Sequence, residues 1–252
     1  MIESMIFFPE KHFYEKPQDY GFHFEEVRIT TPDKTELFGW YLLSAEGLAK
    51  PVLLFFHGNA GNIANRLYKV KGWIERGFNV FLIDYRGYGK SSGKIHSEDD
   101  VIQDARAALD WLCQEKKIAL PRIVLYGESL GTYPAIYLGS ELPVAAVILE
   151  APFTSLFDVA RTHYPFVPSG LMQPFQFSNM TAISKLKAPL FILHGTEDEI
   201  CPYAMAGELF EKASQPKGFL TIPGGHHNDL PIAAGSDFYD KPHEFILHNV
   251  FP

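Results

Sequence analysis

VLYGESLGTY, residues 124–133, places a serine between two glycines. The apolar residues before Gly127 are typical of a buried strand, and the sequence after Ser129 favours a helix. GESLG fits the pattern G-x-S-x-G, in which the serine lies on a tight strand-to-helix turn. The serine backbone is then strained, and the flanking positions must be small because longer side chains would collide with the adjacent helix and strand. We therefore predict that Ser129 lies at the edge of a sheet, beside a helix N-terminus that favours developing negative charge.

A serine hydroxyl becomes a useful nucleophile when a base takes its proton and an acid orients that base. On this kind of turn the acid and then the histidine follow the serine in the chain. FILHGTEDEICP, residues 191–202, carries Glu197, Asp198 and Glu199 after a strand-like run, and FLTIPGGHHND, residues 219–229, carries His226 and His227 after the next. Because parallel strands end at one edge of a sheet, these groups are expected to meet there.

Within each cluster one residue is favoured. Asp198 lies four residues after His194, far enough into its loop to turn back toward the sheet edge, although Glu150 after the preceding strand is an alternative acid. His227 lies one residue further along the loop than His226, so the chain has more length in which to turn back toward the serine. His226 is therefore expected at the surface or beside the site. We expect no metal and no other cofactor, because no further ligands occur at a recognisable metal spacing.

Two backbone N–H groups are needed to bind the oxyanion of an acyl-transfer reaction. One is expected from Leu130, directly after the serine. The other is expected from Asn59 in HGNAGN, residues 57–62, because glycines let this loop approach a ligand closely. His57 is expected to form a buried hydrogen bond that shapes the loop.

The rest of the chain alternates between strands and helices. Residues 22–30 and 35–43 predict an N-terminal antiparallel hairpin, and buried strands follow at 51–56, 78–84, 122–127, 144–153, 188–195 and 218–224. Helical patterns lie between them, which predicts an α/β fold with a mostly parallel sheet covered on both faces. We expect a single domain over residues 1–252, with a short cap-like insertion at about 153–185 and no large cap domain.

This insertion is rich in apolar residues. It is either one helix with a packed surface loop or an apolar wall of the substrate pocket. In the second interpretation the substrate-binding residues are Phe153, Tyr164, Phe166, Leu171 and Met172.

Composition excludes several classes of protein. The net charge of −8 argues against a nucleic-acid partner on electrostatic grounds. No run reaches the length of a membrane span, and the start MIESMIFFPEKHF lacks the features of a signal peptide, so it is expected to begin the folded domain. The two cysteines, Cys113 and Cys201, indicate free thiols in a reducing compartment, and a cytoplasmic location is expected.

FFHGNAGN, DYRGYGKSSG, GESLG, EAPFTS, HGTEDE and GGHHND together resemble the α/β-hydrolase fold family. The motifs resemble one branch in particular, which contains the cap-less bacterial hydrolases grouped with serine aminopeptidases and the abhydrolase-domain protein depalmitoylases. The usual ending G-x-G-H-N-D of this branch, laid on GGHHND, implies that His227 is the base, with His226 in place of the second glycine. The resemblance also favours Asp198 as the acid and assigns no catalysis to Asp84, in a structural loop near the site.

These observations predict a serine hydrolase that cleaves small-molecule carboxylic esters or thioesters of short-to-medium acyl chains through an acyl-enzyme on Ser129. An aminopeptidase-type amidase is an alternative, but Asp158 is the only acid in residues 153–185 that could bind a peptide N-terminus. A non-catalytic small-molecule-binding protein of the same fold is the alternative from another class.

Overall fold

The computed structural model describes residues 3–45, 51–166, 170 and 175–251. Within these residues one sheet holds eight strands in the order β10-β9-β8-β7-β4-β6-β3-β2. Strand β3 is antiparallel to both β2 and β6, whereas the other neighbours pair in parallel. The strands are β2 (His23–Thr30), β3 (Glu36–Leu43), β4 (Val52–Phe56), β6 (Asn79–Asp84), β7 (Ile123–Glu128), β8 (Ala146–Glu150), β9 (Leu190–Gly195) and β10 (Lys217–Ile222). The predicted mostly parallel sheet and N-terminal hairpin are confirmed.

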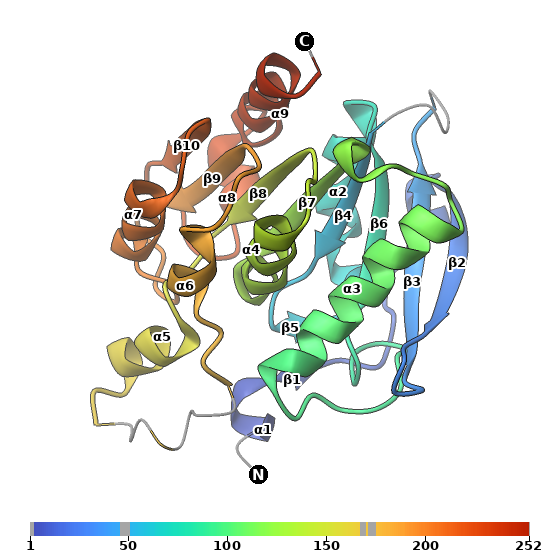
Figure 1. Cartoon of the computed structure of the whole chain (residues 1–252), viewed down its shortest axis with the longest axis horizontal. Helices are drawn as coiled ribbons and strands as arrows, with labels where there is room; N and C mark the ends of the chain where they lie inside the picture. Colours follow the sequence, from blue (N-terminus) through green and yellow to red (C-terminus); the bar gives the residue numbers. More distant parts are fainter. Residues whose placement is uncertain (1–2, 46–50, 167–169, 171–174, 252) are drawn as a thin grey trace.

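Helices cover both faces of the sheet (Figure 1). On strand β4, Leu54 and Phe56 pack into one apolar cluster, and Leu53 and Phe55 pack into the other, as alternation along a strand requires. The first cluster includes α3 (Glu98–Gln114), α4 (Thr132–Glu141), α6 (Asn179–Ile183) and α7 (Tyr203–Lys212). The second includes α2 (Leu67–Glu75), α8 (Leu230–Ala234) and α9 (Asp237–Asn249). Burial on both faces explains why the central strands are continuously apolar.

The segment between β8 and β9 contributes two helices within the described residues. Helix α5 (Leu156–His163) begins after Ser155, whose hydroxyl accepts a hydrogen bond from the backbone N–H of Asp158 at 3.0 Å. Helix α6 then returns the chain to β9. Residues 167–169 and 171–174 lie outside the described part of this segment.

The N-terminal segment forms structure that the sequence pattern does not indicate. A short helix, α1 (Glu3–Ile6), leads into β1 (Phe8–Pro9), which pairs in parallel with β5 (Ala60–Gly61). The backbone N–H of Glu10 also donates to the carbonyl of Gly61 at 3.0 Å. The start of the chain is therefore attached to the loop after β4, near the edge of the sheet where α5 lies (Figure 1).

No helix within the described residues has the length and apolar character needed to cross a membrane.

Candidate active site

Ser129 lies on a strained turn between β7 and α4. Its φ angle is +50°, in the left-handed region that non-glycine residues rarely adopt. A Cβ atom at Gly127 would lie 2.5 Å from the carbonyl oxygen of Gly131, and one at Gly131 would lie 2.0 Å from that of Phe56. Both glycines are thus required by close backbone contacts, and the turn directs Ser129 beyond the end of the sheet.

Two hydrogen bonds connect Ser129 to a histidine and an aspartate. His227 Nε2 lies 3.0 Å from Ser129 Oγ, and His227 Nδ1 lies 2.8 Å from Asp198 Oδ2. The three residues follow the ends of β7, β9 and β10, which the parallel sheet brings to one edge. This geometry allows the imidazole to take the serine proton while its other nitrogen donates to the carboxylate.

Asp198 is held as a carboxylate by several donors. Its Oδ1 accepts from the backbone N–H groups of Ile200 at 2.9 Å and Cys201 at 2.7 Å. His194 Nε2 lies 3.1 Å from Oδ2. Burial alone would raise the pKa of Asp198, but the hydrogen bonds from His194 and His227 outweigh it and hold this pKa well below its usual range. An ionised Asp198 can stabilise the positive charge that forms on His227 when it takes the serine proton.

The neighbouring candidates lie elsewhere. The side chain of His226 is 51% exposed, and its Nδ1 contacts Glu199 Oε2 at 3.2 Å rather than Ser129. Glu150, the alternative acid, is buried against Lys69 and Tyr126.

The loop after β4 brings Asn59 to the cavity beside Ser129, where Leu130 also lies. Tyr88 fixes the loop by donating its hydroxyl to the carbonyl of Asn59 at 2.7 Å, and the Asn59 amide donates to the carbonyl of Ile6. His57 is fully buried, with Nδ1 2.7 Å from the carbonyl of Gly58. This is the loop-shaping contact expected for it, whereas the roles of the Asn59 and Leu130 N–H groups stay a prediction.

A buried network of charges lies directly beneath the serine turn. Glu128 accepts two hydrogen bonds from Arg66, and Lys69 Nζ lies 3.5 Å from Glu128 and 2.7 Å from Glu150. The Tyr126 hydroxyl donates to Glu150 at 2.6 Å. Burial would raise the pKa of Glu128, but Arg66 and Lys69 outweigh it and hold this pKa well below its usual range. Each carboxylate is thus compensated by a cation, as burial requires.

A cavity of about 290 Å³ opens at Ser129. Its apolar lining comes from the N-terminal segment, the loop after β8, helix α5 and the loop after β9. These residues are Ile6, Phe8, Phe153, Leu156, Val159, Ile200 and Cys201. Most of these residues were missed from the sequence. Ile200 and Cys201 had a signal, their position directly after Asp198, but the short N-terminal stretch has no periodic pattern.

Of the five residues predicted to bind substrate, Phe153 lines this cavity. Tyr164 and Phe166 are 71% and 96% exposed and are not among its lining residues, so the expected aromatic wall is wrong for them. Helix α5 ends at His163, and Tyr164 and Phe166 follow it with their side chains in solvent. Leu171 and Met172 lie outside the described residues.

No group of three or more histidine, cysteine, aspartate or glutamate side chains in the described ranges is arranged to hold a metal ion.

Comparison with known proteins agrees with this architecture. The family model described as serine aminopeptidase, S33 matches residues 47–169. An uncharacterized protein of Mycobacterium tuberculosis is 34% identical over 221 residues, which cover 88% of this chain and 78% of the relative. The alpha/beta hydrolase domain-containing protein WAV2 of Arabidopsis thaliana is 31% identical over 97% of this chain and 87% of its own length.

Among solved structures, an esterase from Pyrococcus furiosus superposes with a TM-score of 0.79 at 21% identity, covering 98% of each chain. At this identity the likeness concerns the fold. The sequence relatives show that the chain belongs to the α/β-hydrolase family, and the structural likeness agrees with that fold.

Proposed function

We propose that this protein hydrolyses carboxylic esters or thioesters of short-to-medium acyl chains through an acyl-enzyme on Ser129. The observation that carries the proposal is the pair of hydrogen bonds that connects Ser129 to His227 and His227 to Asp198, at 3.0 and 2.8 Å.

In this mechanism the Ser129 oxygen attacks the acyl carbonyl carbon while His227 takes the hydroxyl proton. Asp198 stabilises the resulting imidazolium, and the backbone N–H groups of Asn59 and Leu130 bind the tetrahedral oxyanion. The carbon–oxygen or carbon–sulfur bond to the leaving group then breaks, and His227 gives that group its proton. Water attacks the acyl-enzyme by the same steps in reverse, which releases the carboxylic acid and restores Ser129.

The cavity supports the substrate class. Its volume of about 290 Å³ is at the small end of ligand pockets, which run from roughly 300 to 1,000 Å³. Ile6, Leu156 and Val159 give it an apolar surface that suits an acyl chain.

The name of the matching family model makes aminopeptidase activity the second candidate. Binding the ammonium group of a peptide N-terminus needs a carboxylate that is not already paired with a cation. Glu128 lines the cavity, but Arg66 already occupies both of its oxygens. Asp158 is not among the lining residues and accepts hydrogen bonds from the hydroxyls of Thr154 and Ser155. Ester hydrolysis is therefore favoured over amide hydrolysis.

The test measures turnover of p-nitrophenyl acetate, butyrate, octanoate and palmitate beside aminoacyl-p-nitroanilides. We expect the highest turnover on butyrate or octanoate, and nearly complete loss in Ser129→Ala with an unchanged circular dichroism spectrum. A clear preference for anilides would reverse the order of the two candidates.

A fluorophosphonate probe distinguishes an enzyme from a non-catalytic binding protein. We expect the folded protein to be labelled at Ser129, with labelling lost in His227→Ala because the hydroxyl then lacks its base. Failure of the native protein to react would favour the binding protein.

A further inference from the structure

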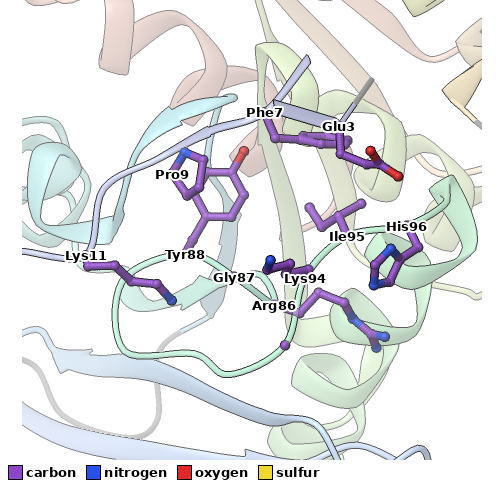
Figure 2. Close-up of a pocket in the computed structure, with 11 residues that line it drawn as sticks. Glu3, Phe7, Pro9, Lys11, Arg86, Gly87, Tyr88, Lys94, Ile95 and His96 are labelled. Carbon is purple, nitrogen blue, oxygen red and sulfur yellow. The ribbon is translucent and has the colours of Figure 1, made fainter. Parts of the chain in front are cut away.

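A second cavity, of about 530 Å³, lies between the N-terminal segment and the loop that follows β6. Figure 2 shows Glu3 and Phe7 on one side of it and Arg86 and Lys94 on the other, with Tyr88 and Ile95 between them. The proposed hydrolytic mechanism does not use this cavity.

One stretch of chain separates the two cavities. Ile6 and Phe8 line the cavity at Ser129, whereas Phe7 and Pro9 line the second cavity. Phe8 and Pro9 form β1, in which successive side chains point to opposite sides, and Phe7 lies between helix α1 and this strand. A ligand in the second cavity therefore occupies a volume distinct from that of the acyl substrate.

The surface of the second cavity combines apolar and basic groups. Phe7, Tyr88 and Ile95 are at most 7% exposed and present buried apolar surface to it. The basic groups are Lys11, Arg86, Lys94 and His96, and Glu3 is the one carboxylic acid among the described residues that line the cavity.

The arginine does not supply spare charge. Its guanidinium is held by three carboxylates, those of Asp33, Asp100 and Asp104, at 2.7 to 2.8 Å. Arg86 therefore lines the cavity with its charge already neutralised, and an anionic ligand is expected to bind the other basic residues.

The two lysines are differently placed. Lys11 donates to the backbone carbonyl of Ser91 at 3.0 Å, an uncharged partner. Neither Lys11 nor Lys94 forms an ion pair with a residue in the part of the chain that the structure describes. A protein of net charge −8 thus places two lysines without an ion pair to any described residue in the lining of an apolar cavity.

We propose that this cavity is a binding site for an amphipathic carboxylate with an unbranched apolar chain. The carboxylate binds Lys11 and Lys94, and the chain packs against Phe7, Tyr88 and Ile95. Charge-assisted hydrogen bonds give the selectivity for an anion, and the volume lies within the ordinary range of small-molecule sites.

The first experiment is titration calorimetry of the full chain with sodium decanoate, compared with decanol and decyltrimethylammonium at equal concentration. We expect decanoate to bind more tightly than either, with an affinity that falls as salt is added. Equal binding of decanol or of the cation would overturn the proposal.

The double variant Lys11→Met, Lys94→Met tests the two ammonium groups. We expect decanoate affinity to fall at least about 10-fold, which corresponds to the loss of one to two charge-assisted hydrogen bonds. Lys90→Met is the matched control, because Lys90 lies in the same loop, pairs with Glu26 at 3.4 Å and does not line the cavity. An unchanged affinity in the double variant would refute the site.

Two cavity-filling variants then locate the bound chain. Ile95→Trp fills the second cavity and is expected to abolish decanoate binding. Val159→Trp fills the cavity at Ser129 and is expected to leave decanoate binding unchanged. The reverse pattern would place decanoate in the Ser129 cavity and overturn the proposal. Thermal unfolding of both variants shows whether they fold. If Ile95→Trp does not fold, the lysine variants decide whether decanoate binds in the second cavity. These binding measurements need no catalytic turnover, so they stand apart from the test of hydrolysis.

Discussion

Arg66 and Glu128 are joined by two hydrogen bonds, from Nε to Oε2 and from Nη2 to Oε1, each 3.1 Å long. Glu128 directly precedes Ser129 in the chain. A third nitrogen of the same guanidinium, Nη1, donates to the carbonyl of Ala60 at 2.7 Å, directly after Asn59. One side chain therefore fixes the serine turn relative to the loop that carries the second proposed oxyanion donor.

Arg66→Lys should reduce kcat by about 10- to 100-fold while KM changes little, because a lysine cannot bridge both segments with a rigid fork. Arg66 is a positioning residue in this prediction, so the loss appears in the transition state rather than in substrate binding. Steady-state kinetics on p-nitrophenyl butyrate measure both constants. Arg106→Lys is the control, since Arg106 pairs with Glu141 at the surface. A rise in KM at constant kcat would instead mean that Arg66 contacts the substrate.

Gly131→Ala should greatly reduce both the yield of folded protein and its activity. The new methyl group would lie 2.0 Å from the carbonyl oxygen of Phe56, so the turn or β4 must move, at a cost of at least about 1–3 kcal/mol. Gly207→Ala is the matched control, because it lies in helix α7 with nothing within 4 Å of the added atom. Chemical denaturation should show Gly207→Ala to be neutral or more stable by up to about 1 kcal/mol. A Gly131→Ala protein of native stability would contradict the close-contact argument.

The sheet and the serine turn could be predicted because their signals are local. The run VLLFF is apolar throughout because both faces of β4 are covered. The five residues GESLG indicate a tight turn, because both glycines are in close contact with neighbouring backbone. Parallel strands end at the same edge of a sheet. Ser129, Asp198 and His227 each follow such a strand, so they could be expected to meet.

Other features depend on contacts between distant segments. Arg66 and Glu128 are 62 residues apart, and nothing local to either one indicates the pair. Ile6 and Phe8 line the cavity only because β1 pairs with β5, a match of two residues that is too short to show a strand period. Phe166 was expected in the cavity because of apolar composition, which does not determine the direction in which a side chain points.

His227→Ala should lower turnover by several orders of magnitude, close to the loss in Ser129→Ala. The two residues act as a unit, so removing either one removes most of the rate enhancement that they provide together. His226→Ala should cost less than about 10-fold, since its ring is half-exposed and contacts Glu199 rather than Ser129. Turnover of p-nitrophenyl butyrate by the three variants checks this. Near-native turnover in His227→Ala together with loss in His226→Ala would reverse the two assignments.

Asp84 and His57 form a buried pair behind the loop that carries Asn59. His57 Nδ1 must donate to the carbonyl of Gly58, which leaves the Nε2 lone pair 3.5 Å from Asp84 Oδ1. Burial lowers the pKa of His57 to about 3, and burial raises the pKa of Asp84 to about 8 despite a hydrogen bond from the backbone N–H of Ile63. We therefore expect the pair to be uncharged at neutral pH, with the proton on the carboxyl group.

Asp84→Asn should gain stability relative to the native protein as the pH rises from about 4 to about 8. An aspartate with a folded pKa of about 8 binds more protons in the folded state than in the unfolded state, where its pKa is about 3.9. The native protein therefore loses stability through this window, by an amount on the order of a few kcal/mol, and the asparagine removes the loss. Urea unfolding of both proteins at pH 5, 7 and 9 measures the difference. Asp104, whose pKa is raised to about 6 by burial, is present in both proteins and cancels. A difference between the two that stays constant with pH would show that Asp84 is ionised in the folded protein.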